Sequence, residues 1–114
     1  MMMMLIMMNK DIKEEWSIWT AFVRFREGFG GKVRPVIVLE DNIVLCLCIG
    51  VTSQEKCYRN DYKLKHWEHA GLKKESWVVP EYLELGQNKF KRRIGMLHPD
   101  DIQCLKEWVR DLSN

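Results

Sequence analysis

The chain has 114 residues, of which 46% are hydrophobic and 30% charged, and its formal net charge is +2. This length and composition are typical of one globular domain and argue against an intrinsically disordered protein. The apolar run at residues 1–8 is far shorter than the roughly 20 residues that span a bilayer. No basic segment or small-residue cleavage site accompanies it, so we expect neither a membrane span nor a secretory signal.

The two ends of the chain differ from its middle. We expect residues 1–15 to form a flexible or helical N-terminal arm and residues 16–114 to form a single domain. Residues 16–98 carry 14 Lys/Arg against 9 Asp/Glu, whereas the two ends together carry 4 against 7. A basic body suits a phosphate backbone, although a solvated surface of mixed charge would have the same composition.

The first half of the domain has the pattern of β-strands. Residues 17–25 are rich in β-branched and aromatic side chains, and a glycine-rich connection follows at 26–31. The apolar runs at 33–39 and 43–51 are too short for typical helices. The Glu-Asp-Asn turn at 40–42 joins them into a predicted β-hairpin, because Asp and Asn tolerate left-handed backbone angles and bond their own main chain.

The second half contains weaker strand signals and one clear helix. Tyr58, Tyr62 and Leu64 indicate a further strand, and residues 76–79 are β-prone before Pro80, which we expect to end the strand or hold it at an edge. A basic cluster follows at 89–93.

Residues 99–112 have the pattern of an amphipathic helix. Pro99 suits the first helical position, and two aspartates follow it at the positive helix end. The apolar stripe consists of Ile102, Leu105, Trp108, Val109 and Leu112. Central strands with a packed terminal helix predict a small α+β domain, mainly β, with antiparallel pairing.

The four cysteines indicate buried small hydrophobic residues. Cys46 and Cys48 point to one face of a strand and Leu47 to the other. A zinc site would need Cys57 or a histidine to complete the ligands. His66 and His69 would suit a metal only on a helix with other ligands nearby, so we predict no metal site and no cofactor. In the absence of a secretory signal, reduced thiols in a cytoplasm are expected.

Polar residues at the ends of two strands indicate an anion site. Arg34 lies at the mouth of one apolar strand, and Thr52 and Ser53 lie at the exit of the next. A guanidinium can donate two parallel hydrogen bonds to phosphate oxygens, and it stays charged. Two alternatives remain open: Arg34 as a surface ion-pair partner, and the Thr-Ser pair as the cap of a local turn.

The order of these motifs resembles the MazF/PemK family of toxins from bacterial toxin–antitoxin pairs. The resemblance spans residues 17–112. Its pieces are Ile18-Trp19, the glycine loop, Lys32-Val33-Arg34-Pro35, Val51-Thr52-Ser53, Gly71-Leu72-Lys73-Lys74-Glu75-Ser76 and Ile94-Gly95-Met96-Leu97. It implies an SH3-like antiparallel barrel of the CcdB/PemK-like type with a C-terminal helix. It also implies a homodimer that cuts single-stranded RNA at short sequences without a metal.

The resemblance assigns roles to five residues. The implied reaction is attack of the ribose 2′-OH on the adjacent phosphorus, which leaves a 2′,3′-cyclic phosphate and a free 5′-OH. Arg34 matches the catalytic arginine and would stabilise phosphate charge, while Thr52 would orient the scissile phosphate. Glu81 would accept the 2′-OH proton, unless it is only an exposed edge residue. Lys32 and Ser53 are the RNA-binding candidates.

The implied partner is a small antitoxin whose disordered tail blocks Arg34, and the implied location is the cytoplasm. Two other functions remain open: a non-catalytic RNA- or protein-binding module on the same barrel, and a gyrase-poisoning toxin of the same fold. The chain also departs from the family pattern. It has Trp16-Ser17 where Gly-Asp is frequent, and Glu84-Leu85 where a basic residue and Thr are frequent. The second departure would place a carboxylate where RNA phosphates approach.

Overall fold

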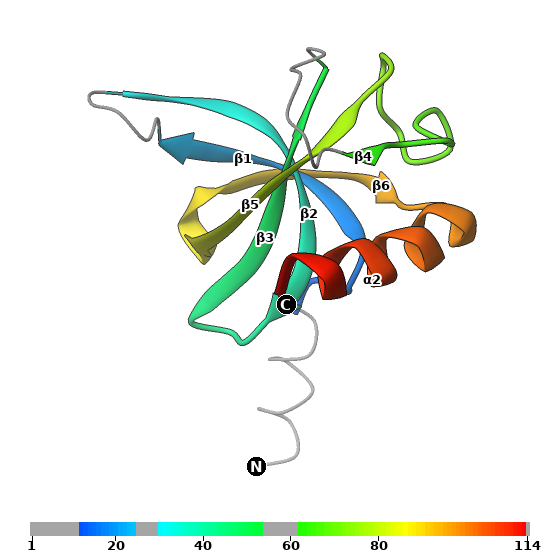
Figure 1. Cartoon of the computed structure of the whole chain (residues 1–114). Helices are drawn as coiled ribbons and strands as arrows, with labels where there is room; N and C mark the ends of the chain where they lie inside the picture. The colour runs from blue at the N-terminus through cyan, green and yellow to red at the C-terminus, as the bar shows by residue number, and fades with distance from the viewer. Residues whose placement is uncertain (1–11, 25–29, 54–61, 114) are drawn as a thin grey trace, which may run out of the picture.

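The computed structural model describes residues 12–24, 30–53 and 62–113. All strand pairs are antiparallel, and the strand order in the single sheet is β4-β5-β3-β2-β1-β6. The elements are β1 (Ser17–Arg24), β2 (Gly31–Asp41), β3 (Leu45–Thr52), β4 (Tyr62–Lys63), β5 (Trp77–Gly86), the 3₁₀ turn η1 (Gln87–Lys89), β6 (Phe90–Met96) and α2 (Pro99–Ser113). The strands cross steeply and α2 lies along one side of the sheet (Figure 1). The predicted class, mainly β with a C-terminal helix, is confirmed.

The sheet carries one apolar cluster on each face, because successive side chains of a strand point in opposite directions. The first cluster is covered by α2 and by the segment that precedes β5; its buried residues include Ile18, Ile37, Ile49, Val51, Leu64, Val78, Leu97 and Leu105. The second cluster uses the alternate positions of the same strands, namely Ala21, Val23, Val36, Val38, Cys46, Cys48 and Leu85.

The helix α2 packs as its periodicity predicts. Leu105 is fully buried, and Ile102 and Trp108 pack against the first cluster. The side chain of Leu112 lies outside the described residues. No helix in the described ranges is long and apolar enough to cross a membrane.

A buried carboxylate joins the first turn of α2 to the segment after β4. Asp101 is fully buried. Its Oδ1 accepts hydrogen bonds from the Tyr62 hydroxyl (2.9 Å) and the Lys65 backbone N–H (3.0 Å), and its Oδ2 accepts one from the His66 backbone N–H (2.9 Å). A buried charge is tolerated only when it is partnered in this way. Burial and the bond to Asp101 also raise the pKa of Tyr62.

The segment between β4 and β5 rests directly on β6. Gly71 has a left-handed φ of +90°, and a Cβ added to it would lie 2.7 Å from the Ile94 side chain. A Cβ added to Gly95 would lie 2.4 Å from the Ala70 carbonyl oxygen. The two glycines therefore allow a backbone approach that larger residues would prevent.

The hairpin between β2 and β3 forms, but its turn is one step later than predicted. The left-handed residue is Ile43, with φ 80°, rather than Asp41 or Asn42. Asp41 Oδ1 accepts a hydrogen bond from the Ile43 N–H (2.9 Å), and Asn42 Oδ1 accepts one from the Leu45 N–H (2.8 Å). Both side chains bond to backbone N–H groups that follow them, so the bend falls after them.

Pro80 does not end its strand, but the alternative prediction, a place at an edge, is confirmed, because the pairing with β4 stops at Val78. β5 continues through Pro80, and its pairing with β3 shifts register between Ile49 and Val51. The short strand β4 pairs only with Trp77 and Val78. Pro80 therefore lies past the end of β4 and within an irregular part of the β3 ladder, where a missing N–H is tolerated. Of the other strand predictions, Tyr58 and Phe25 lie outside the described residues.

The strand cysteines are buried side by side, as predicted. Cys46 and Cys48 are both fully buried, with 3.6 Å between their sulfur atoms. The neighbouring Cys46 thiol and burial raise the pKa of Cys48. Cys104 is a half-buried free thiol in α2, and Cys57 lies outside the described residues.

A polar network anchors the residues just before β1. Most of the predicted N-terminal arm, residues 1–11, lies outside the described residues. The backbone N–H of Lys13 donates to Asp41 Oδ2 (2.8 Å), and the Lys13 ammonium donates to Gln87 Oε1. Gln87 Nε2 donates to Asp41 Oδ1 (2.8 Å), and the Asp41 side chain is only 1% exposed. The network links the end of β2, η1 and the residues that enter β1.

This network predicts a pH-dependent contribution to stability. Burial raises the pKa of Asp41, but hydrogen bonds from the Lys13 and Ile43 N–H groups and from Gln87 outweigh burial and lower the pKa overall. A carboxyl whose folded pKa is depressed stabilises the fold above its unfolded pKa of about 3.9. This stabilisation is lost as pH falls through the folded pKa.

We therefore expect Asp41→Asn to lower the free energy of unfolding by about 1–3 kcal/mol at neutral pH. The difference in the free energy of unfolding between this variant and the native chain should become smaller as pH falls below about 4. Urea titrations across pH measure both quantities. Glu40→Gln, at an exposed neighbour, is the control, and a gap that stays constant with pH would contradict the argument.

Candidate active site

The start of β2 and the end of β3 meet at one pocket. The two strands are antiparallel with Val36 opposite Gly50, so the residues before Val36 lie beside the residues after Gly50. The pocket has a volume of about 180 Å³ and is lined by Lys32, Val33, Arg34, Pro35, Val51, Thr52 and Ser53. Four of the five predicted site residues therefore come together.

Glu81, the fifth predicted residue, lies on the other side of Arg34. A second pocket of about 120 Å³ is lined by Val23, Arg24, Arg34, Gly50, Val79, Glu81 and Leu83. Arg34 is the predicted site residue that lines both pockets. The structure thus places a guanidinium between a pair of hydroxyls and a carboxylate.

The two pockets contain more cationic than anionic side chains. Arg24, Lys32 and Arg34 line them together with the single carboxylate of Glu81. Arg34 is half-buried, and no ion pair joins it to another residue within the ranges that the structure describes. A half-buried cation of this kind is suited to an external anion. The alternative role of Arg34, a surface ion-pair partner, stays a prediction.

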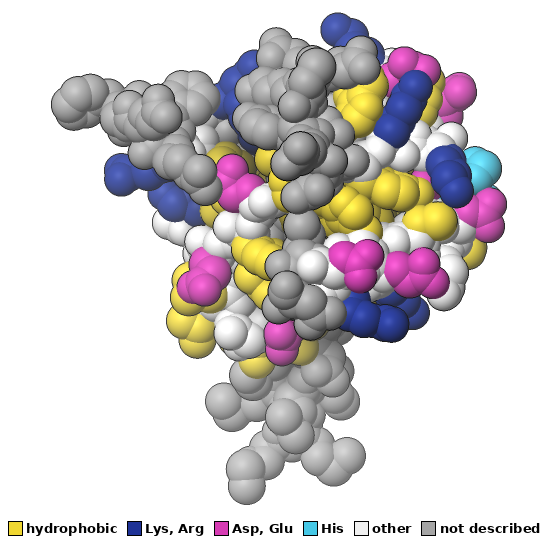
Figure 2. Space-filling model, viewed as in Figure 1, with side chains coloured by type: hydrophobic (Ala, Val, Ile, Leu, Met, Phe, Trp, Pro, Cys, Tyr) yellow, Lys and Arg dark blue, Asp and Glu magenta, His cyan; other side chains and the backbone are white. Residues whose placement is uncertain are grey.

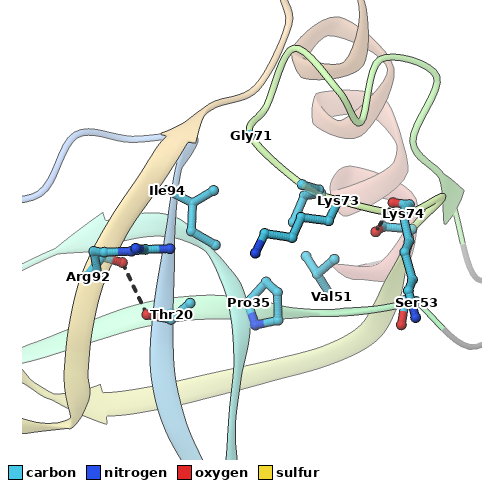
Figure 3. A pocket seen from close by; sticks show the side chains of 11 residues that line it. Thr20, Pro35, Val51, Ser53, Gly71, Lys73, Lys74, Arg92 and Ile94 are labelled. Carbon is cyan, nitrogen blue, oxygen red and sulfur yellow. Dashed lines mark hydrogen bonds between the residues drawn. The ribbon is translucent and has the colours of Figure 1, made fainter.

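A larger cavity of about 350 Å³ adjoins this site. It shares Pro35, Val51 and Ser53 with the pocket that contains Arg34. Its other lining residues are Thr20, Gly71, Leu72, Lys73, Lys74, Ser76, Arg92 and Ile94. Figure 3 shows the Lys73 side chain extending above Pro35 and Val51, with Arg92 beyond Ile94. The cavity therefore combines apolar walls with cationic side chains.

Sequence reasoning did not select Lys73 or Arg92 as site residues. Arg92 belongs to the predicted basic cluster at 89–93, and Lys73 belongs to the motif at 71–76 that precedes β5. The close approach of Gly71 to Ile94 and of Gly95 to Ala70 brings the two regions together. The Thr20 hydroxyl also donates to the Arg92 carbonyl oxygen (3.3 Å; Figure 3).

Glu84 lies away from Arg34. Tyr82 and Glu84 line a groove of about 510 Å³ together with Glu15, Trp16, Leu39, Glu40, Leu47 and Val109. Leu85 instead belongs to the same buried cluster as Val36. Because alternate residues of β5 point to opposite faces, Glu81 faces the Arg34 site and Glu84 faces α2. The unusual Glu-Leu pair therefore does not place a carboxylate in the Arg34 pockets.

The face in view in Figure 2 is of mixed charge. Acidic and basic side chains are interspersed on it around an apolar area. Among the described residues, cationic side chains gather at the pockets around Arg34, where Arg24 and Lys32 join it.

The histidines occupy a separate place. His66 stacks on His98, with 3.9 Å between ring centroids, and His69 meets His98 edge-on at 4.9 Å. His98 directly precedes α2, and its Nδ1 accepts a hydrogen bond from the Asp100 N–H (3.0 Å), as in a helix N-cap. These three histidines do not line the pockets around Arg34.

Solved structures share this fold. An endoribonuclease from Mycobacterial species aligns with a TM-score of 0.66 at 6% identity, over 88% of this chain and 89% of that one. The Mycobacterium tuberculosis toxin MazF-mt6 aligns with a TM-score of 0.63 at 16% identity, over 82% of this chain and 94% of that one. A MazE–MazF structure from Deinococcus radiodurans aligns with a TM-score of 0.66 at 17% identity, over 88% of this chain and 94% of that one. At these identities the likeness shows the fold alone.

A comparison with curated protein sequences gives no match. The family profile of the PemK-like, MazF-like toxins of type II toxin–antitoxin systems matches residues 14–112, nearly the whole chain. The match covers every strand that the structure describes and all of α2 except its last residue, and it agrees with the resemblance in the order of the sequence motifs. The chain therefore belongs to the PemK-like, MazF-like family of type II toxins.

Proposed function

We propose that the protein is a sequence-selective, metal-independent endoribonuclease toxin that cleaves single-stranded RNA. Family membership supports this proposal, as do structural neighbours that are endoribonucleases. The observation that carries it is the position of Arg34 between a pocket lined by Thr52 and Ser53 and a pocket lined by Glu81.

Each of these residues has a role in cleavage through the ribose 2′-OH. Glu81 accepts the proton of the 2′-OH as its oxygen bonds to phosphorus. Arg34 stabilises the negative charge that develops on the phosphate oxygens, and Thr52 orients the phosphate. The bond from phosphorus to the 5′ oxygen breaks, and that oxygen takes a proton from water. The products are a 2′,3′-cyclic phosphate and a free 5′-OH.

The adjoining cavity supplies binding energy for the rest of the RNA. Its volume and apolar walls suit one nucleobase, and Lys73 and Arg92 suit a flanking phosphate. Lys32 and Ser53 contact the scissile phosphate in the neighbouring pocket. Single-stranded RNA fits because its unpaired bases can enter a cavity, whereas bases stacked in a duplex cannot.

The same surface is suited to an inhibitor. One solved neighbour is an endoribonuclease in complex with its cognate antitoxin, with a TM-score of 0.66 at 8% identity. We infer that a small antitoxin places an acidic, disordered tail against Arg34 and the lysines beside it. We further infer that the toxin acts as a homodimer in the cytoplasm, where its RNA substrate and reduced thiols are found.

The central test is removal of the guanidinium. We expect Arg34→Ala to lower the cleavage rate by about 10²–10³, because it removes one charge-stabilising interaction of the transition state. Thr52→Ala should lower it less. Cleavage of a fluorogenic single-stranded RNA measures the rates, and circular dichroism checks the fold.

Lys106→Ala, at an exposed position of α2, is the matched control and should cleave normally. Native rates in the Arg34 and Thr52 variants would refute the site. A native chain that binds RNA without cutting it would instead indicate a non-catalytic binding module.

Cleavage should persist in EDTA, since the proposed groups complete the reaction with the 2′-OH of the substrate. Replacing only the scissile ribose by deoxyribose should abolish it, because the nucleophile is then missing. Mass spectrometry of the products should show a cyclic phosphate. A requirement for Mg²⁺, or cleavage of the deoxy substrate, would contradict this mechanism.

The cavity beside the site makes a prediction about RNA binding. Lys73→Ala should weaken binding and flatten the plot of log affinity against log salt by about 0.7, the value for one lost phosphate contact with a single strand. Glu84→Gln should leave both unchanged, because Glu84 lines a separate groove with Glu40 and Val109. Fluorescence anisotropy with a non-cleavable RNA measures both. A slope that responds to Glu84 and not to Lys73 would place the RNA in the groove that Glu84 lines.

A further inference from the structure

Two histidines and an aspartate converge where the segment after β4 meets α2. His66 Nε2 lies 3.0 Å from Asp100 Oδ2, and His98 Nδ1 lies 3.7 Å from the same oxygen. One potential ligand atom from each of the three residues lies within 4.8 Å of the others. His66 and Asp100 are 34 positions apart in the sequence, so the fold creates this cluster.

The spacing suits a small divalent ion. Zinc binds imidazole nitrogen and carboxylate oxygen at about 2.0–2.2 Å, so two ligands of a tetrahedral site lie about 3.3 Å apart. The two distances to Asp100 Oδ2 bracket this value. The His66 and His98 rings stack with 25° between their planes. Rotation about χ2, which is a soft torsion, can turn both nitrogens toward one ion.

The backbone around the cluster is already fixed. Asp101 accepts hydrogen bonds from the N–H groups of Lys65 and His66, which holds the first histidine against α2. The His98 carbonyl accepts from the Ile102 N–H (3.0 Å), which holds the second at the helix start. Little ordering of the chain is therefore needed for binding.

The ligand atoms are also accessible. The side chains of His66, His98 and Asp100 are 39%, 30% and 65% exposed. An ion can thus enter from solvent and keep one coordination position for water. Rotation of the His98 ring would release the Asp100 N–H, which donates to His98 Nδ1, to water.

We propose that His66, His98 and Asp100 bind a divalent transition-metal ion of the zinc class, for which two imidazoles and one carboxylate are suitable ligands. This site is separate from the Arg34 pockets. It is structural rather than catalytic, because it clamps the β4–β5 segment to α2. That segment carries Leu72, Lys73 and Lys74 into the cavity beside Arg34, so the ion would stabilise the wall of the RNA cavity.

Isothermal titration of the tag-free, EDTA-stripped full chain with ZnCl₂ tests the site. We expect one ion per chain and a melting temperature that rises with zinc until the site is filled. His66→Gln and His98→Gln should each weaken binding at least about tenfold, in line with loss of one ligand. His69→Gln, which removes a neighbouring histidine outside the ligand set, should bind as the native chain does.

Two further measurements keep the test decisive. Asp100→Asn retains the backbone and the size of the side chain but supplies a weaker ligand, so it should bind more weakly while melting normally in EDTA. The visible spectrum of the Co²⁺-loaded chain should lack a thiolate charge-transfer band. Absence of zinc binding, binding that survives both histidine variants, or a thiolate band that reports Cys104 or Cys57 would overturn the proposal.

Discussion

The antiparallel pairing of β2 with β3 is the constraint on which the candidate active site depends. Antiparallel neighbours place the start of one strand beside the end of the other, so Arg34 and Thr52 meet without any special loop. The alternation of side chains then directs both toward one end and one face of the sheet. Val36, Val38 and Cys48 lie on the same face of these strands and belong to a buried cluster. Their burial fixes the register of the strands, because a slip of one residue would expose them.

A second constraint comes from polar atoms that have no access to water. The carboxylate of Asp101 is buried, and its charge is tolerated because three hydrogen bonds converge on it. These bonds hold the β4–β5 segment on α2, while the close approach of Gly71 to β6 holds its other end. The cavity walls that contain Lys73 and Arg92 are therefore set by interactions that lie outside the cavity itself.

The two faces of the sheet separate the functions of neighbouring acidic residues. Glu81 lines a pocket with Arg34, whereas Glu84, three residues later, lines the groove beside α2. The carboxylate at position 84 therefore does not line the pockets that contain Arg34. The departure from the family pattern at Glu84-Leu85 places Glu84 in the groove beside α2 and Leu85 in the buried cluster on the opposite face.

The sequence by itself determined the features that depend on local order. Periodicity predicted the β2–β3 hairpin and α2, alternation predicted the paired burial of Cys46 and Cys48, and the short hairpin was enough to bring Arg34 toward Thr52. Tertiary structure decided the rest. The register shift around Pro80, the burial of Asp101, the meeting of Lys73 with Arg92 and the clustering of His66 with His98 all join residues from different parts of the chain. Such contacts depend on how the sheet coils and how α2 packs on it, and neither residue type nor spacing along the sequence specifies that geometry.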